Sequence, residues 1–177
     1  LVAGTDTNGD GVIDNILVGT PGGTTAGQSE SGSFYSFSKT SMAPSLPTAV
    51  DGIASNDQYG TKVVQLGDID SDGTIDYLVT SPNANYDYTQ VGMIQVISGA
   101  SGNVLATIRG TQQSQRFGID ALYFYNKLFV TTASGAVYRF YNNELLHITN
   151  IDEYQNNSDN NKLPARSSFG YNKPVGI

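Results

Sequence analysis

Short runs of apolar and β-branched residues recur along the chain, separated by clusters of Gly, Asn, Asp and Ser. In the clearest stretch the runs fall at about 61–67, 77–81, 92–98 and 103–109. Such runs predict strands, and the Gly- and Asn-rich link between the last two predicts a hairpin. Because apolar residues occupy both alternating sets of positions in 92–98, we expect that strand to be covered on both faces. No long segment has the apolar period of an amphipathic helix, so the expected fold is all-β.

The same arrangement repeats along the chain. The segment that begins at Asp6 aligns with the one that begins at Asp68, 62 residues later, and a third, eroded copy follows. Each repeat has room for four short strands, which is typical of propeller blades. We therefore expect residues 1–177 to form one region of about three β-propeller-type blades, each of four antiparallel strands. The expected repeats are 1–57, 58–115 and 116–166, with 167–177 as the opening strand of a further blade or of the first.

The composition narrows the possible functions. Thirteen of the 16 acidic residues are Asp, which is a poor helix former but a good turn residue and calcium ligand. The nine Lys and Arg residues form no basic stripe, so we expect no nucleic-acid partner. There is no Cys, which excludes disulfides and thiolate metal sites. No run of 18 apolar residues is present, so we expect no membrane span.

Seven of the Asp residues fall in two loops with the spacing Asp-x-Asx-x-Asp-Gly-x-x-Asp. Side chains at loop positions 1, 3, 5 and 9, with the carbonyl at position 7, can surround a cation with the oxygen ligands that Ca²⁺ takes. The expected ligands of the first loop are Asp6, Asn8, Asp10, Val12 (through its carbonyl) and Asp14. Those of the second are Asp68, Asp70, Asp72, Thr74 (through its carbonyl) and Asp76. We predict two Ca²⁺ sites, the second tighter because Asn8 removes one charge from the first.

The loops differ from an EF-hand, which needs a Glu at position 12 and flanking helices. That position holds Leu17 or Val79, each inside an expected strand. The alternative is that the loops are only solvated Asx-turns; two copies at equivalent positions favour metal binding. Clustered carboxylates repel one another without an ion, so we expect the ion to add to folding stability. Because modest sites fill at extracellular calcium concentrations, we expect an extracellular or cell-surface location.

In the third repeat the acidic loop is missing. The run that begins at Asp120 meets the run that begins at Leu128 across Asn126-Lys127, which predicts a tight hairpin turn. No cluster of carboxylates accompanies it, so we expect no calcium in that blade.

These residues resemble the FG-GAP repeat of integrin α-type propellers, in the form found in bacterial members. The openings are Tyr59-Gly60, Phe117-Gly118 and Phe169-Gly170, and the acidic loops are followed by Gly19-Thr20-Pro21 and Thr80-Ser81-Pro82. The resemblance covers nearly the whole chain. It implies a β-propeller with calcium in its blades and a role in surface adhesion or structural assembly.

Three blades cannot close a ring that typically needs four to eight. The first repeat lacks an opening Phe-Gly strand, whereas 167–177 carries a spare one. The chain is therefore expected to be a segment of a larger propeller, to complete its own first blade with that strand, or to donate it to a neighbouring copy in a homo-oligomer or filament.

Little in the sequence indicates an enzyme. We expect the single His, His147, to be a structural residue. No nucleophile-elbow, zinc-protease or phosphate-loop motif is present. Aromatic faces pack on sugars, so Tyr86, Tyr88 and Tyr123 are candidates for a glycan-binding surface, although Tyr also packs well within sheets. We expect a non-catalytic, calcium-stabilised adhesion or structural region with an unidentified protein or glycan ligand; the alternative is a carbohydrate-binding module, attached to an enzyme in a longer chain.

Overall fold

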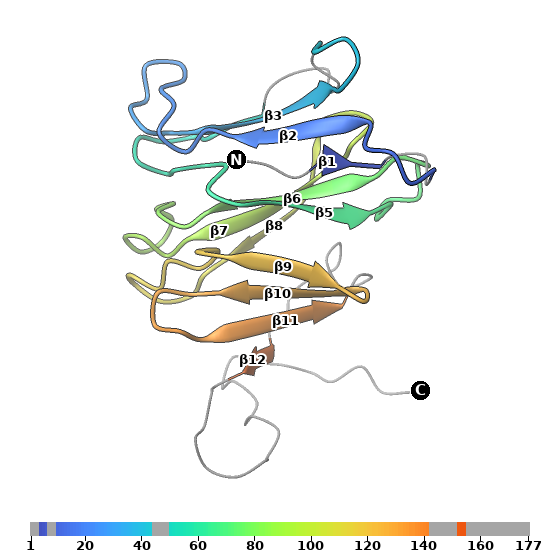
Figure 1. Ribbon diagram of the computed structural model, residues 1–177. Coiled ribbons are helices and arrows are strands. Elements are labelled where there is room, and N and C mark those ends of the chain that lie inside the picture. The colour runs from blue at the N-terminus through green and yellow to red at the C-terminus, as the bar shows by residue number, and fades with distance from the viewer. Residues whose placement is uncertain (1–3, 7–9, 44–49, 142–151, 155–177) are drawn as a thin grey trace.

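The described residues of the computed structural model, 4–6, 10–43, 50–141 and 152–154, contain strands and turns and no helix. They form three four-stranded sheets (Figure 1). Sheet 1 consists of β1 (Gly4–Thr5), β2 (Asn15–Gly19), β3 (Ser33–Ser38) and β4 (Val50–Asp51). Sheet 2 consists of β5 (Val63–Gly67), β6 (Asp76–Ser81), β7 (Met93–Ile97) and β8 (Val104–Arg109). Sheet 3 consists of β9 (Ala121–Phe124), β10 (Lys127–Thr131), β11 (Val137–Tyr141) and β12 (Asp152–Tyr154).

Each sheet is a meander in which every strand pairs antiparallel with the next along the chain. The expected all-β class and antiparallel strands are therefore confirmed. The four strands of sheet 2 follow the predicted ranges to within two residues at each end.

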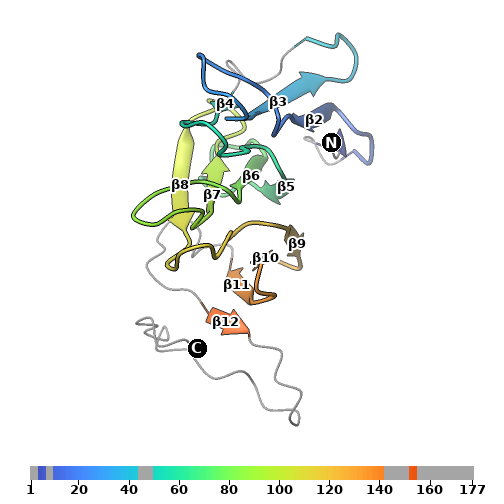
Figure 2. The same cartoon turned by 90° about the vertical axis from the view of Figure 1, so that its left-hand side faces the viewer.

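The sheets lie face to face in chain order, with sheet 2 in the middle (Figures 1 and 2). Every residue of β6 and β7 is buried. Within β6, Tyr77 and Val79 belong to the core cluster shared with sheet 1, whereas Leu78 belongs to the cluster shared with sheet 3. Alternate side chains point to opposite faces of a strand, so the two clusters cover the two faces of sheet 2. The prediction that 92–98 is covered on both faces is confirmed.

The junctions between sheets share one backbone contact. Gly32, just before β3, forms a parallel bridge with Tyr59 of the next repeat, and Gly92, just before β7, forms the same bridge with Phe117. Tyr59 donates its backbone N–H to Ser31 O at 2.9 Å, as Phe117 does to Val91 O at 3.0 Å. Two Gly-aromatic pairs therefore join three sheets.

The backbone at these glycines leaves no space for a side chain. A Cβ at Gly32 would lie 2.1 Å from Tyr59 O, and one at Gly92 would lie 2.3 Å from Phe117 N. Both glycines also have positive φ, +77° and +80°, which L side chains adopt at a cost. The approach of consecutive sheets therefore requires glycine here.

The hairpin of sheet 3 is one residue displaced from its predicted position. Tyr125 and Asn126, with φ of 48° and 57°, occupy the turn, and Lys127 already pairs with Phe124 in the sheet. Positive φ at both central residues is the mark of a type I′ turn, which matches the twist of paired strands. Asn is well suited to such a position, whereas Lys127 has a partner on each side, Phe124 and Tyr141.

The first repeat has an opening strand of its own. β1 pairs with β2 through Gly4 opposite Ile16 and Thr5 opposite Asn15, so sheet 1 reaches four strands without residues 167–177. The expectation that this repeat lacks its opening strand is wrong, although the Phe-Gly motif is missing. Residues 167–177 and His147 lie outside the described residues. In the part of the chain that the structure describes, no helix is long and apolar enough to cross a membrane.

Candidate metal centre

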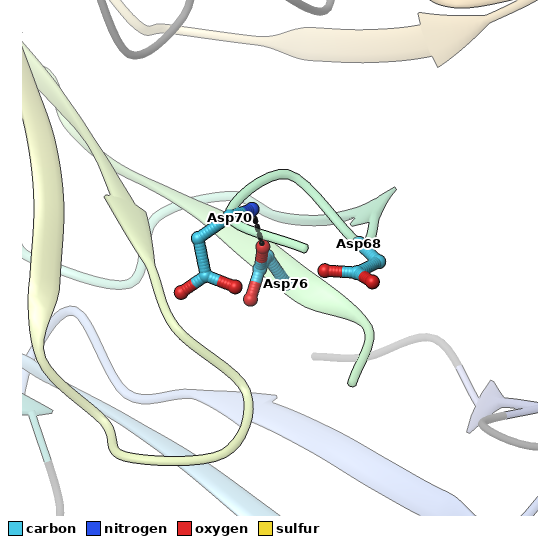
Figure 3. A group of neighbouring side chains, drawn as sticks. All are labelled: Asp68, Asp70 and Asp76. Atoms are coloured by element: carbon cyan, nitrogen blue, oxygen red, sulfur yellow. Dashed lines mark hydrogen bonds between the residues drawn. The ribbon is translucent and has the colours of Figure 1, made fainter. Parts of the chain in front are cut away.

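The second acidic loop connects β5 to β6 and brings three predicted ligands together. Carboxylate oxygens of Asp68, Asp70 and Asp76 all lie within 4.8 Å of one another (Figure 3). Asp68 directly follows β5 and is exposed, Asp70 is partly buried, and Asp76 is the first residue of β6. The acidic spacing therefore places carboxylates from both ends of the loop in one group.

Backbone N–H groups hold the loop around these carboxylates. Asp68 accepts from Gly73 N–H at 3.0 Å and from Asp72 N–H at 3.1 Å. Gly73 has a φ of +86°, which allows the backbone to reverse at loop position 6. Asp72, the third predicted ligand, accepts from Thr74 N–H at 2.8 Å. The contact of Asp72 is an Asx-turn, whereas those of Asp68 reach four and five residues along the chain and close the loop.

Asp76 is the buried member of the group. One carboxylate oxygen accepts from Ile69 N–H at 2.7 Å, and the other accepts from Gly99 N–H at 2.9 Å. Gly99 lies in the turn between β7 and β8, so Asp76 connects the loop to that hairpin. Burial raises the pKa of Asp76 and the charge of Asp70 adds to this rise, while the backbone hydrogen bonds oppose it. A cation beside this carboxylate would offset the cost of burying its charge.

Asp72 does not belong to the group of three carboxylates, and Thr74 is predicted to contribute only its carbonyl. One oxygen of Asp72 is engaged by Thr74 N–H, and the other lies 3.5 Å from Ser98 Oγ. Both residues remain in the loop, with Asp72 exposed and Thr74 partly buried. Of the five residues predicted for this site, the structure therefore gathers three carboxylates and leaves Asp72 at the edge of the loop.

The first loop repeats part of this hydrogen bonding. Gly11 donates its N–H to Asp6 at 2.7 Å, as Gly73 does to Asp68, and Val12 donates to Asp10 at 2.8 Å, as Thr74 does to Asp72. Gly11 has a φ of +85°, close to that of Gly73. Asp14 is partly buried just before β2, whereas Val12 is exposed. Asn8 lies outside the described residues.

The side-chain atoms of the second loop that could bind a metal are all carboxylate oxygens. Carboxylates suit hard cations such as Ca²⁺ and Mg²⁺ and offer nothing to a soft metal that prefers sulfur. The residues present therefore fit a calcium ion.

Sheet 3 has a different feature at the corresponding end. Its first two strands are joined by the two-residue turn Tyr125-Asn126, in place of an acidic loop. Asp120, just before β9, forms an ion pair with Lys62 of the preceding repeat, with Nζ and Oδ1 2.8 Å apart. This hydrogen-bonded Lys62 holds the pKa of Asp120 below its usual range. The carboxylate of Asp120 is thus used to join sheets 2 and 3.

The three tyrosines considered for sugar binding do not form one surface. Tyr86 and Tyr88, 49 % and 53 % exposed, lie in the connection between β6 and β7. Tyr123 lies in β9 beside the turn at the opposite end of its sheet and packs against the core cluster between sheets 2 and 3. Arg109 stacks on the ring of Tyr86, with its guanidinium carbon 3.4 Å from the ring centroid, and donates to the Tyr86 hydroxyl. Arg109 could not be identified from the sequence, because it lies 23 residues from Tyr86 and no local pattern links the two.

No known protein family matches this chain, and no curated protein matches it.

Proposed function

We propose that this chain is a non-catalytic, calcium-stabilised region of an extracellular β-propeller that serves adhesion or structural assembly. The observation that carries the proposal is the grouping of Asp68, Asp70 and Asp76 in a loop whose hydrogen bonds recur in the first repeat. The same acidic spacing, with part of the same hydrogen bonding, at equivalent positions of two repeats supports a site that belongs to the scaffold.

The propeller arrangement is supported by the way the sheets follow one another. Each sheet is a four-stranded meander, consecutive sheets lie face to face, and the same Gly-aromatic bridge forms at both junctions. Such a series is what radial repetition of blades produces. The resemblance of the acidic loops and aromatic-Gly openings to FG-GAP repeats adds to this support.

Calcium would act as a structural ion in this proposal. Each loop joins the first and second strands of its sheet, so an ion there links two strands and neutralises clustered charge. Its binding energy would add to the free energy of unfolding. Sites of modest affinity are filled at extracellular calcium concentrations, which supports a surface or secreted location.

The test uses Asp70→Asn and Asp10→Asn in separate variants. Asn keeps a side-chain oxygen that can accept the backbone N–H, so a loop that is only an Asx-turn should melt as the parent does, with or without calcium. If the loops hold calcium, the parent melts at a higher temperature with calcium than with EDTA, and each variant loses part of that shift. Asp87→Asn, an exposed Asp outside the loops, is the matched control. An identical calcium response in parent and variants would overturn the proposal.

A carbohydrate-binding module is the second candidate. Tyr86 and Tyr88 are both about half exposed on one connection, and Arg109 holds the Tyr86 ring. A fixed aromatic ring next to a cationic hydrogen-bond donor is suited to one face and one hydroxyl of a sugar. A glycan array with and without EDTA separates the two candidates: specific sugar binding that Tyr88→Ala abolishes would favour the module.

A further inference from the structure

The face of sheet 3 that points away from sheet 2 carries several apolar side chains, together with Lys127 and Arg139. The residues that define this outer face are Leu122, Phe124, Phe129 and Val137. Leu122 and Phe124 are 60 % and 59 % exposed. The alternate residues of β10, Leu128 and Val130, are fully buried in the cluster shared with sheet 2.

Equivalent positions in the other two sheets are covered by the sheet that follows. The register of the strands makes Val137 of sheet 3 equivalent to Ile94 of sheet 2 and Phe34 of sheet 1. Their partners on the second strand are Thr131, Thr80 and Gly19. Phe34 and Ile94 are fully buried in the clusters formed with the next sheet. The outer face of sheet 3 therefore carries apolar residues, beside Lys127 and Arg139, where the other two sheets are covered, and the described residues do not cover it.

The covering sheet starts in the same way at both junctions. The residue before the aromatic donates its backbone N–H to the carbonyl of the residue two positions before the bridging glycine. Gln58 donates to Glu30 O at 3.0 Å, and Arg116 donates to Gln90 O at 2.9 Å. The glycine after the aromatic then packs on the end of the second strand; a Cβ at Gly118 would lie 3.2 Å from Thr80 Cβ.

Sheet 3 carries the receiving half of such a junction. Gly135 precedes β11 as Gly92 precedes β7, and its φ is +84° against +80°. A Cβ at Gly135 would have no described residue within 4 Å, whereas one at Gly92 would lie 2.3 Å from Phe117 N. Gly135 thus occupies the position at which Gly92 contacts Phe117, and no described residue makes that contact.

The chain itself holds a matching donor half. Ser168-Phe169-Gly170, outside the described residues, repeats the aromatic-Gly opening of Tyr59-Gly60 and Phe117-Gly118. Tyr154 ends β12, and the 15 residues from there to Phe169 can extend up to about 50 Å. The two earlier connections, from Asp51 to Tyr59 and from Arg109 to Phe117, use only eight.

We propose that the outer face of sheet 3 is a docking surface for the chain's own segment 168–177, with Phe169 opposite Gly135. Phe169 N–H then donates to Ser134 O and Ser168 N–H to Ala133 O, by the rule of the two described junctions. Gly170 packs on Thr131, and the segment opens a fourth sheet over Phe129 and Val137. This extends the sheet series of the proposed propeller and needs no metal.

The test is a cross-link between two introduced cysteines, which are the only thiols because the chain has none. Ala133→Cys with Ser168→Cys is the test pair, in the full 177-residue chain. Glu30→Cys with Gln58→Cys, the equivalent pair at the first junction, is the positive control, and Ser41→Cys with Ser168→Cys is the negative control. A short bis-maleimide is added, and the linked peptides are identified by mass spectrometry on a mixture of ¹⁵N-labelled and unlabelled protein.

The proposal expects the test pair to link within one chain at a yield close to that of the positive control. Phe169→Ala should lower this yield at least about tenfold, because truncating a buried Phe costs several kcal/mol. The proposal would be overturned if the positive control links and the test pair does not. It would also be overturned if links form only between labelled and unlabelled chains, because the surface would then belong to a second copy. Since none of the three cysteine pairs lies in an acidic loop, a failure of calcium binding leaves this result unaffected.

Discussion

Gly92 and Phe117 form a parallel backbone bridge that joins sheet 2 to sheet 3, and the space for the bridge exists only because position 92 has no side chain. Gly32 and Tyr59 form the same bridge between sheets 1 and 2. The contacts between consecutive sheets thus repeat along the chain, as the strands within each sheet do.

The first prediction follows from that contact. Gly92→Ala should lower the free energy of unfolding by more than about 2 kcal/mol, because it adds a backbone clash to the cost of a positive φ. Gly27→Ala has the same sign of φ, +81°, with nothing within 4 Å, so it should lose only about 1–2 kcal/mol. Gly22→Ala, with neither feature, should be close to neutral. Urea unfolding measures all three, and equal losses for Gly92 and Gly27 would contradict the role assigned to the bridge.

A second prediction concerns the hydroxyl of Tyr59. This hydroxyl is buried and has no hydrogen-bond partner among the described residues, and burial raises the pKa of Tyr59. The equivalent residue of the next repeat is Phe117, which is also fully buried. Tyr59→Phe should therefore stabilise the protein by about 1 kcal/mol, and the reciprocal Phe117→Tyr should destabilise it by about 1–3 kcal/mol. Thermal melts of the two variants decide the matter; a loss of stability in Tyr59→Phe would mean that the hydroxyl has a partner.

Local features of the fold could be predicted from the sequence because they depend on neighbouring residues. Alternation, turn composition and the acidic spacing located the strands of sheet 2 and placed Asp68, Asp70 and Asp76 in one loop. The two-residue strand β1 escaped prediction because it carries no motif and is defined only by its pairing with β2.

Contacts between distant segments could not be predicted in this way. The hydrogen bond from Gly99 to Asp76 and the stacking of Arg109 on Tyr86 each join segments 23 residues apart. Such contacts depend on how sheets and hairpins pack, which a local pattern does not contain.

The third prediction compares the two acidic loops. Asn8→Asp gives the first loop the four carboxylates of the second and should tighten its calcium binding by roughly an order of magnitude, since affinity follows ligand charge. Asp70→Asn makes the reciprocal change in the second loop and should weaken it similarly. Isothermal titration calorimetry should resolve two sites that approach one another in affinity in either variant. Unchanged affinities in both variants would argue against calcium binding by these side chains.

The fourth prediction concerns Asp57, a buried carboxyl with one oxygen on the N–H of Ala54 at 2.9 Å and the other without a partner among the described residues. Burial raises the pKa of Asp57, and the hydrogen bond from Ala54 N–H opposes the rise only in part. The corresponding residue of the next repeat is Gln115, whose side-chain oxygen accepts from Thr111 N–H at 2.6 Å. An uncharged amide thus fills the equivalent place between the second and third sheets.

The sign of the pH dependence follows from the direction of the pKa shift. Because the folded state holds the Asp57 proton more tightly than the unfolded state, its contribution to stability is complete below the ordinary pKa of 3.8 and is lost as the pH rises through the folded-state pKa. Asp57→Asn removes the charge and keeps an oxygen for Ala54 N–H, so at pH 7 the variant should be more stable than the parent by on the order of 1 kcal/mol. The advantage should vanish below pH 3.8, where the parent carboxyl is protonated in both states. Urea unfolding of both proteins from pH 3 to 8 measures the difference, with Asp87→Asn as an exposed control. An advantage that persists unchanged at low pH would show that packing, and not the charge of Asp57, separates the two proteins.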